Sequence, residues 1–225
     1  MTTKLKEKRK ASVFEALIPI IGVIAILLYT SMPLFTKEFT VHISLSLGVL
    51  LASLIAILFC GQTWGELEEN MIKNIRKVMN LLIFIAAFNL FISSSIVAGT
   101  IPSLVYQLTG NAAIAEAYKI NLIGLIIPII VIAMIVKKVP IVPSLVLGVF
   151  LNAFAAAVFQ GTKFSDIVVN IHYGGALETG SAFFDKILSR INGYDASLWL
   201  ISLIIITMML VTIFEEMGFI KGAKQ

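Results

Sequence analysis

The chain has 225 residues, of which 59% are apolar and only 13% are Asp, Glu, Lys or Arg. A soluble domain has about 45–50% apolar and about 25% charged residues, so these proportions exclude a soluble globule, a disordered chain and a coiled coil. The net charge of +4 is modest and the basic residues form no stripe with interleaved aromatic residues, which argues against a nucleic-acid partner. The composition is typical of a polytopic membrane protein whose partner is the lipid bilayer.

Long apolar segments without internal charges predict membrane-spanning helices, each of which needs about 20 residues. In chain order we expect these helices at 14–35, 40–60, 78–98, 120–136, 141–160 and 196–214. A basic tail, 1–13, precedes the first helix, and a long loop, 161–195, joins the last two.

Lysine and arginine predict the orientation of these spans. The N-terminal tail, the connections after the second and fourth spans, and the C-terminus together carry twelve of them, whereas the opposite side carries five. Because cytoplasmic loops carry the excess of Lys and Arg, both termini are predicted to be cytoplasmic, in the cell membrane.

The chain also resembles itself at an offset of 100 residues. Seven of the fifteen positions in 45–59 are identical in 145–159, and the register continues without a gap through Gly61 and Gly161. A unit of three spans, repeated in tandem, is inverted in the membrane, as in many secondary transporters. We therefore expect an all-α membrane protein of six transmembrane helices in two inverted-topology three-helix repeats, 14–110 and 111–225. Two similar hairpins of shared composition are the alternative.

Polar residues gather in and just after the third expected span. They are Asn89, Ser93, Ser94, Ser95 and Thr100, and Gly99 with Pro102 is expected to break the helix beside them. Such side chains can form hydrogen bonds between helices. They can also line an ion path, because a broken helix leaves backbone carbonyls free to bind a cation. Both interpretations stay open at this point.

A second candidate lies in the long loop, where Glu178 and Thr179 stand among three glycines. The segment is either a buried, re-entrant loop or a plain solvated one. No catalytic motif or metal-ligand spacing occurs, and Cys60 is alone, so we expect no enzyme, no metal and no cofactor. No charged side chain lies deep in an expected span, although proton-coupled transporters normally keep one there.

Several stretches resemble, in family order, the NhaC-type Na+/H+ antiporter family of the ion-transporter superfamily, to which malate/lactate antiporters are related. The stretches are 64–69 with 71–73, 98–102, 138–143, 159–161, 178–180 and 197–219. The resemblance implies cation:proton antiport, with Na+ and H+ as the ions. It also implies that ion-binding segments follow each three-span unit in the family, and by that comparison this chain is internally shortened and C-terminally truncated.

Two hypotheses follow for the function. The first is a membrane protein of Na+/H+ antiporter descent that lacks the segments expected to bind the ions. The second is a non-transporting membrane scaffold or interaction protein derived from such a transporter, which works as a homodimer or with a complementary chain.

Overall fold

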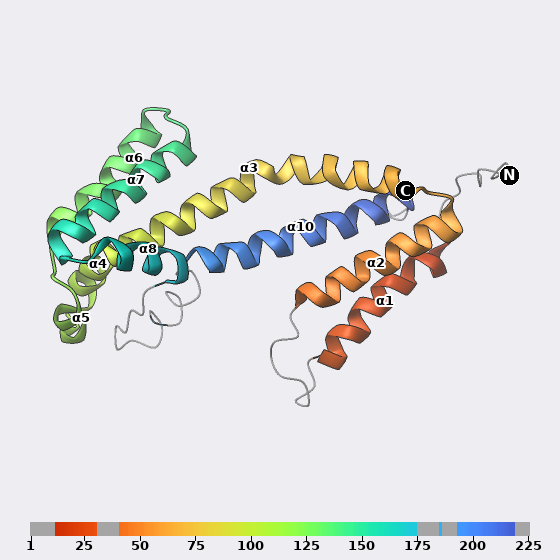
Figure 1. Cartoon of the computed structure of the whole chain (residues 1–225), viewed down its shortest axis with the longest axis horizontal. Helices are drawn as coiled ribbons and strands as arrows, with labels where there is room; N and C mark the ends of the chain where they lie inside the picture. The colour runs from red at the N-terminus through yellow and green to blue at the C-terminus, as the bar shows by residue number, and fades with distance from the viewer. Residues whose placement is uncertain (1–11, 31–40, 175–184, 186–192, 219–225) are drawn as a thin grey trace. The chain divides into compact units, whose positions relative to one another are not determined.

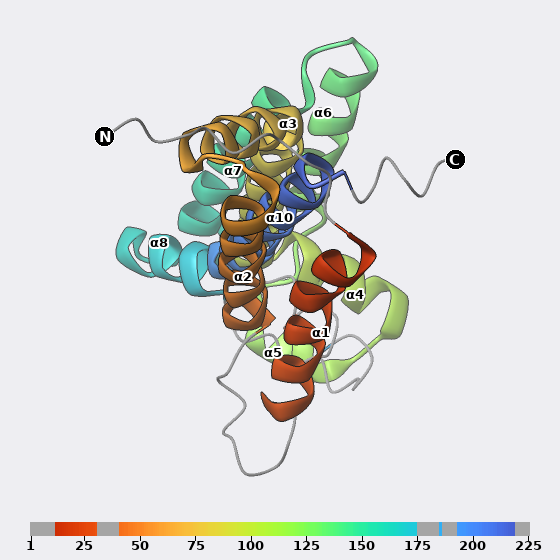
Figure 2. The same ribbon diagram turned by 90° about the vertical axis from the view of Figure 1, so that its right-hand side faces the viewer.

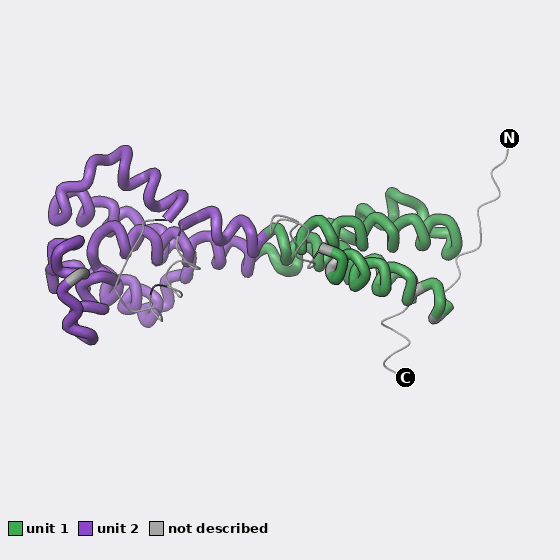
Figure 3. Tube along the Cα trace, turned by 90° about the horizontal axis from the view of Figure 1, so that it is seen from below, with its two compact units in different colours: residues 1–79, 202–225 green, residues 80–201 purple. Residues whose placement is uncertain are grey.

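A computed structural model describes residues 12–30, 41–174, 185 and 193–218, and the regular elements in these residues are all helices. The expected all-α class is therefore confirmed. The chain divides into two compact units, which are coloured separately in Figure 3. Unit 1 comprises Met1–Met79 and Ser202–Gln225, and unit 2 comprises Asn80–Ile201.

Unit 1 begins with a helical hairpin, α1 (Val13–Thr30) and α2 (Val41–Cys60), whose helices lie side by side in Figures 1 and 2. It is completed by the first turns of α3 (Trp64–Val97) and the last turns of α10 (Tyr194–Glu216). At the start of α3, Thr63 and Glu66 form a capping box. The Thr63 N–H donates to Glu66 Oε2 at 3.1 Å, and the Glu66 N–H donates to Thr63 Oγ1 at 3.4 Å.

The core of unit 1 is apolar. One buried cluster joins α2, α3 and the end of α10: Val49, Ala52, Ile55, Ala56, Cys60, Leu67, Met71, Ile213 and Met217. Polar side chains lie at one side of it, where Asn74 Nδ2 donates to Thr212 Oγ1 at 2.9 Å and to Glu215 Oε2 at 3.2 Å. Unit 1 thus buries mainly methyl groups between its helices.

Unit 2 contains the rest of α3, the start of α10 and the helices between them. These are α4 (Thr100–Thr109), α5 (Ala112–Ala117), a 3₁₀ turn η1 (Leu122–Leu125), α6 (Ile126–Val136), α7 (Ile141–Ala155), a π turn η2 (Ala156–Gln160) and α8 (Phe164–Tyr173). The helices α6 and α7 form a second hairpin, which Figure 1 shows beside α3. Its buried cluster joins α3, α6, α7, η2 and α8: Val97, Ala98, Ile127, Ala155, Ala156 and Ile167.

Within the described part of the chain, four helices are long and apolar enough to cross a membrane: Val41–Cys60, Trp64–Val97, Ile141–Gln160 and Tyr194–Glu216. Two further apolar helices, Leu17–Ile26 and Leu122–Val136, are shorter and coincide with the expected first and fourth spans. Four such helices with no strand among the described residues fit an all-α, multi-pass membrane protein.

The expected loop at 161–195 was wrong in its first part, which forms α8. This helix is amphipathic and only ten residues long, so it has no continuous apolar run, but Ile167 is fully buried against the unit 2 core. The expected third span was also too short, because α3 begins at Trp64 rather than near residue 78. Its first turns are amphipathic, with acids where the N-terminal end of the helix dipole favours them.

Residues 100 apart have closely similar local geometry. Gly61 and Gly161 both end a helix in the left-handed region, with φ of 71° and 73°. The next residue in each case, Gln62 or Thr162, donates its N–H to the alanine six residues earlier, at 3.2 Å in both. Each bond spans one residue more than the six-to-one bond of a Schellman motif, and both close a helix end at a left-handed glycine, the usual residue in that position.

Candidate ion-pathway site

The polar residues of α3 first form hydrogen bonds within their own helix. Asn89 Nδ2 donates to Ile85 O at 3.1 Å, and Ser93 Oγ donates to Asn89 O at 2.9 Å. Ser94 and Ser95 both donate to Phe91 O, at 2.9 and 2.8 Å. Back-bonding of this kind places the hydroxyl hydrogens, and it leaves the hydroxyl oxygens free to accept bonds from elsewhere.

The helix is interrupted directly after this polar stretch. α3 ends at Val97, Gly99 has φ of 76°, and α4 begins at Thr100. Glycine is required at this position for its backbone conformation, and a β-carbon there would also displace the side-chain amide at the end of Gln160. Gln160 Nε2 donates to Ala98 O at 3.3 Å and thereby caps one carbonyl at the end of α3.

Asn152 on α7 is the centre of the buried polar group, although the sequence did not single it out. Its Nδ2 donates to Ser95 Oγ at 2.8 Å and to Ser94 Oγ at 3.2 Å. Its Oδ1 accepts from Thr100 Oγ1 at 3.4 Å. All four side chains are buried, and Asn152 has no exposed surface. We call Ser94, Ser95, Thr100 and Asn152 the amide–hydroxyl cluster.

The turn η1 supplies a backbone oxygen to the same place. Thr100 Oγ1 lies 3.4 Å from Gly124 O. One turn along α4, Ser103 Oγ accepts the N–H of Asn121 at 3.1 Å and holds η1 against α4. Asn121 Oδ1 in turn accepts the Ile123 N–H at 2.9 Å and caps the start of η1.

The other expected site residues lie apart from this cluster. Asn89 is half-buried and bonds within α3, whereas Ser93 is buried and accepts the N–H of Gly193 at 2.7 Å. Pro102 is buried in the first turn of α4. Glu178 and Thr179 lie outside the described residues. The structure therefore brings Ser94, Ser95 and Thr100 together and adds Asn152 and Gly124 to them.

The amide–hydroxyl cluster contains no titratable side chain. In the described helices the carboxylates lie near the ends, at Glu15, Glu66, Glu68, Glu69, Glu116, Asp166, Asp195, Glu215 and Glu216. The described residues include no group of three or more His, Cys, Asp or Glu that could hold a metal. Tyr118 packs beside the buried Ile96, and burial raises its pKa above the ordinary 10.0, so its phenol is neutral at physiological pH.

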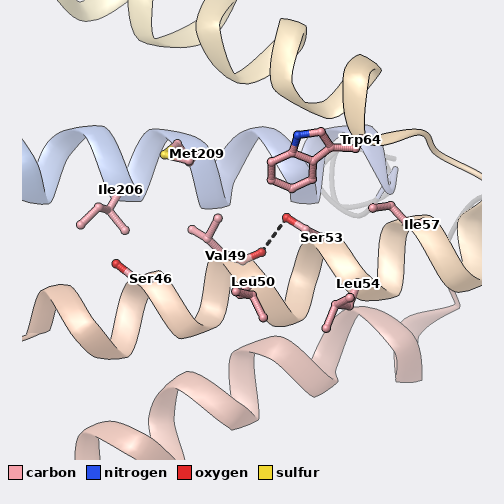
Figure 4. A pocket seen from close by; sticks show the side chains of 9 residues that line it. All are labelled: Ser46, Val49, Leu50, Ser53, Leu54, Ile57, Trp64, Ile206 and Met209. Atoms are coloured by element: carbon pink, nitrogen blue, oxygen red, sulfur yellow. Dashed lines mark hydrogen bonds between the residues drawn. The ribbon is translucent and has the colours of Figure 1, made fainter.

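An apolar groove in unit 1 differs chemically from this cluster. Figure 4 shows Val49, Ser53, Trp64 and Met209 among the side chains around it, and its volume is about 270 Å³. Ser53 Oγ donates to Val49 O at 2.8 Å, so its hydrogen is already bonded within α2. A groove lined in this way suits hydrocarbon and not an ion.

Comparison with known proteins identifies the family. The model described as "Na+/H+ antiporter family" matches residues 64–223. The chain is 27% identical over 117 residues to the Na(+)/H(+) antiporter NhaC of Alkalihalophilus pseudofirmus, an alignment that covers 50% of this chain and 24% of that protein. The chain therefore matches about a quarter of the length of that curated relative.

No solved structure matches the chain. The family resemblance inferred from the sequence motifs is confirmed by the family model and by the curated relative. Because the family model covers well over half of its residues, the chain belongs to the Na+/H+ antiporter family.

Proposed function

We propose that the chain forms the helical framework of a Na+/H+ antiporter and that the amide–hydroxyl cluster lies on its ion pathway. The observation that carries this proposal is a fully buried, neutral polar cluster beside the break between α3 and α4, within otherwise apolar helices. Polar groups at membrane depth are costly and are characteristic of transport pathways. Interrupted helices with free carbonyls are a common way for transporters to bind cations.

The proposed topology has six spans in two inverted repeats, with both termini in the cytoplasm and the protein in the cell membrane. Three observations support it: the Lys and Arg asymmetry, the 100-residue register, and the matching helix ends at Gly61 and Gly161. In this proposal the repeats are 14–110 and 111–225.

Labelling of single cysteines tests this topology. In a Cys60→Ser background, we expect Asn170→Cys to react with a membrane-impermeant maleimide in intact cells. We expect Asn70→Cys to react only after permeabilisation, because the repeat and its inversion place these two positions on opposite sides. Equal labelling of both positions in intact cells would contradict the inverted arrangement.

Antiport itself is proposed to require protein beyond these 225 residues. Exchange of Na+ for H+ needs a group that releases a proton, and the amide–hydroxyl cluster is neutral. We place the ion-binding acids in segments of the kind that the family resemblance implies, supplied by a longer assembly. The second candidate, a non-transporting scaffold that pairs with itself or with a complementary chain, is favoured by the same lack of charge in the cluster.

Reconstitution into liposomes tests whether this chain alone can exchange Na+ for H+. Proteoliposomes that contain only this chain are expected to show no Na+-dependent collapse of an imposed pH gradient above protein-free vesicles. A robust Na+ response that disappears in Asn89→Ala or Glu178→Gln would show instead that the chain carries its own proton-exchanging group. Glu178→Gln is the more informative variant, because it removes only a charge and keeps the size of the side chain.

A further inference from the structure

Three oxygens converge beside the helix break in unit 2. Thr100 Oγ1 lies 3.4 Å from Asn152 Oδ1 and 3.4 Å from Gly124 O. We propose that these three oxygens form part of a binding site for a dehydrated monovalent cation of the size of Na+. The site deepens the proposed function and rests on it only for the identity of the ion.

The three oxygens have more acceptor capacity than donors. Thr100 has one hydroxyl hydrogen, and both of its acceptors lie at the outer limit of a hydrogen bond. Asn152 has already committed its amide hydrogens to Ser94 and Ser95. A cluster with unfilled lone pairs and no spare donor attracts a cation and repels an anion.

Gly124 has an unusually available carbonyl for a residue that leads into a helix. The residue four positions later is Pro128, which has no N–H to donate back to it, and the local donor is the Ile126 N–H. A β-carbon at Gly124 would lie 3.1 Å from Thr100 Oγ1, so glycine also allows the hydroxyl to approach. The sequence thus both frees this oxygen and clears the space around it.

The distances indicate the size of the ion. In an octahedral shell, ligands at about 2.4 Å from the metal are about 3.4 Å from their neighbours, whereas ligands at the roughly 2.0 Å of Mg²⁺ are about 2.8 Å apart. The two separations of 3.4 Å therefore suit an ion in the size range of Na+ and Ca²⁺. Ca²⁺ sites are built around carboxylates, and this oxygen set is neutral, which favours the monovalent ion.

The surroundings make a neutral site effective. Thr100 is 3% exposed and Asn152 is fully buried, so bulk water does not screen the oxygens. Ser103 fixes η1 against α4 through the Asn121 N–H, which holds the Gly124 carbonyl in place.

Equilibrium binding of ²²Na+ to the purified full chain in detergent micelles tests the proposal, with choline keeping the ionic strength constant. The wild-type protein is expected to bind saturably, with K+ as a poor competitor. Thr100→Val keeps the shape but removes the hydroxyl oxygen, and the loss of a ligand to a charged group is expected to weaken binding about tenfold or more. Thr109→Val is the matched control on the same helix, because Thr109 Oγ1 donates to Val105 O and accepts the Asn111 N–H, and neither bond involves the three oxygens.

Asn152→Asp provides a second variant that gains function. It adds a carboxylate of the same shape, so Na+ binding is expected to become tighter and to increase with pH as the carboxyl ionises. The proposal is overturned if the folded wild-type chain binds no ²²Na+, which is the result expected when the three oxygens only hydrogen-bond to one another, or if Thr100→Val binds like wild type. If Thr100→Val does not fold, an Asn152→Asp protein without tighter binding overturns it.

Binding and antiport fail independently in these experiments. Saturable ²²Na+ binding needs no proton exchange, so it can be present in a chain that collapses no pH gradient. Conversely, the chain can perform antiport while Thr100→Val and Asn152→Asp leave ²²Na+ binding unchanged. That combination would support the transport function and contradict the proposed binding site.

Discussion

The two units contain similar helical elements and differ in what they bury. Each has a helical hairpin, helical turns that follow a left-handed glycine, and the last turns of one long helix. In unit 1 the long helix is α10, and in unit 2 it is α3. Ala56 and Ala156, which are 100 residues apart, are both fully buried. Leu67 and Ile167 are also 100 residues apart, and the first is fully buried and the second almost fully buried.

The difference lies at positions 52 and 152. Ala52 is fully buried in the apolar cluster of unit 1, together with Ile213. The corresponding Asn152 is fully buried in unit 2, where its side-chain amide donates a hydrogen bond to Ser94. Ser94 and Ile213 have matching positions, because each lies five residues before a left-handed glycine, Gly99 or Gly218. Similar helices therefore accept either an apolar or a polar core. At this pair of positions, unit 2 buries a hydrogen-bonding amide and unit 1 buries a methyl group.

Exchanging these two residues is expected to have the largest effect on stability. Ala52→Asn places an amide among methyl groups with no described partner, and overpacking plus desolvation is expected to cost about 3–5 kcal/mol. Asn152→Ala loses hydrogen bonds and leaves a small cavity, which is expected to cost about 1–3 kcal/mol. Unfolding by SDS in mixed micelles measures both, and equal tolerance of Asn at both positions would contradict the distinction between the units.

Glycines at the hairpin contacts provide the next largest effect. A β-carbon at Gly48 would overlap a methyl group of Val23, and one at Gly148 would lie 2.6–2.8 Å from the Phe91 ring and Val131. Gly48→Ala and Gly148→Ala are each expected to destabilise the protein by about 1–3 kcal/mol, because neither neighbour can move freely.

Gly65→Ala is the control for this pair. It lies in the first turn of α3 with no atom within 4 Å of the added β-carbon. Alanine there is expected to leave the protein unchanged or to stabilise it by up to about 1 kcal/mol, since it favours the helix more than glycine does. If all three variants behave alike, the hairpin contacts are looser than the structure indicates.

The sequence predicted the features that depend on local pattern. Runs of about 20 apolar residues marked the long helices. The pair Gly99 and Pro102 marked the interruption, because glycine adopts positive φ and proline favours the first turn of a helix. The serines of α3 were recognised because polar side chains are rare in such a helix.

The sequence did not reveal the partners of these serines, because tertiary packing selects them. Asn152 lies more than fifty residues from Ser94 and Ser95, and the oxygen of Gly124 is a backbone group with no side chain to recognise. One signal was present in the 100-residue register of the sequence, in which Asn152 aligns with Ala52. If the register marks two copies of one unit, as proposed, a polar residue in one copy is a position where their functions can differ.

The glutamines beside the left-handed glycines are expected to have unequal effects on stability. Gln62 Nε2 donates to Glu216 O at 3.3 Å, whereas Gln160 bonds to Ala98 O and to both the N–H and the carbonyl of Lys119. Gln160→Ala is expected to cost about 1–3 kcal/mol and Gln62→Ala about 0.5–1.5 kcal/mol, in proportion to the bonds lost. The same SDS titration measures them, and a larger cost for Gln62 would reverse the expected order.

The smallest expected effect concerns the start of the helix that follows the left-handed glycine in each unit, α3 after Gly61 and α8 after Gly161. Thr63 caps α3 through its reciprocal bonds with Glu66, whereas Lys163, one hundred residues later, provides no side-chain cap for α8. Thr63→Ala is therefore expected to destabilise the protein by about 1 kcal/mol. Lys163→Thr is expected to stabilise it by about 0.5 kcal/mol, because Asp166 occupies the position of Glu66 and can complete a capping box.

Amide hydrogen exchange in the first turns of α3 and α8 distinguishes local capping from a change elsewhere. Protection should fall in α3 for Thr63→Ala and rise in α8 for Lys163→Thr. A gain at Lys163 without greater protection in α8 would mean that the loss of the lysine charge, and not the new cap, is responsible.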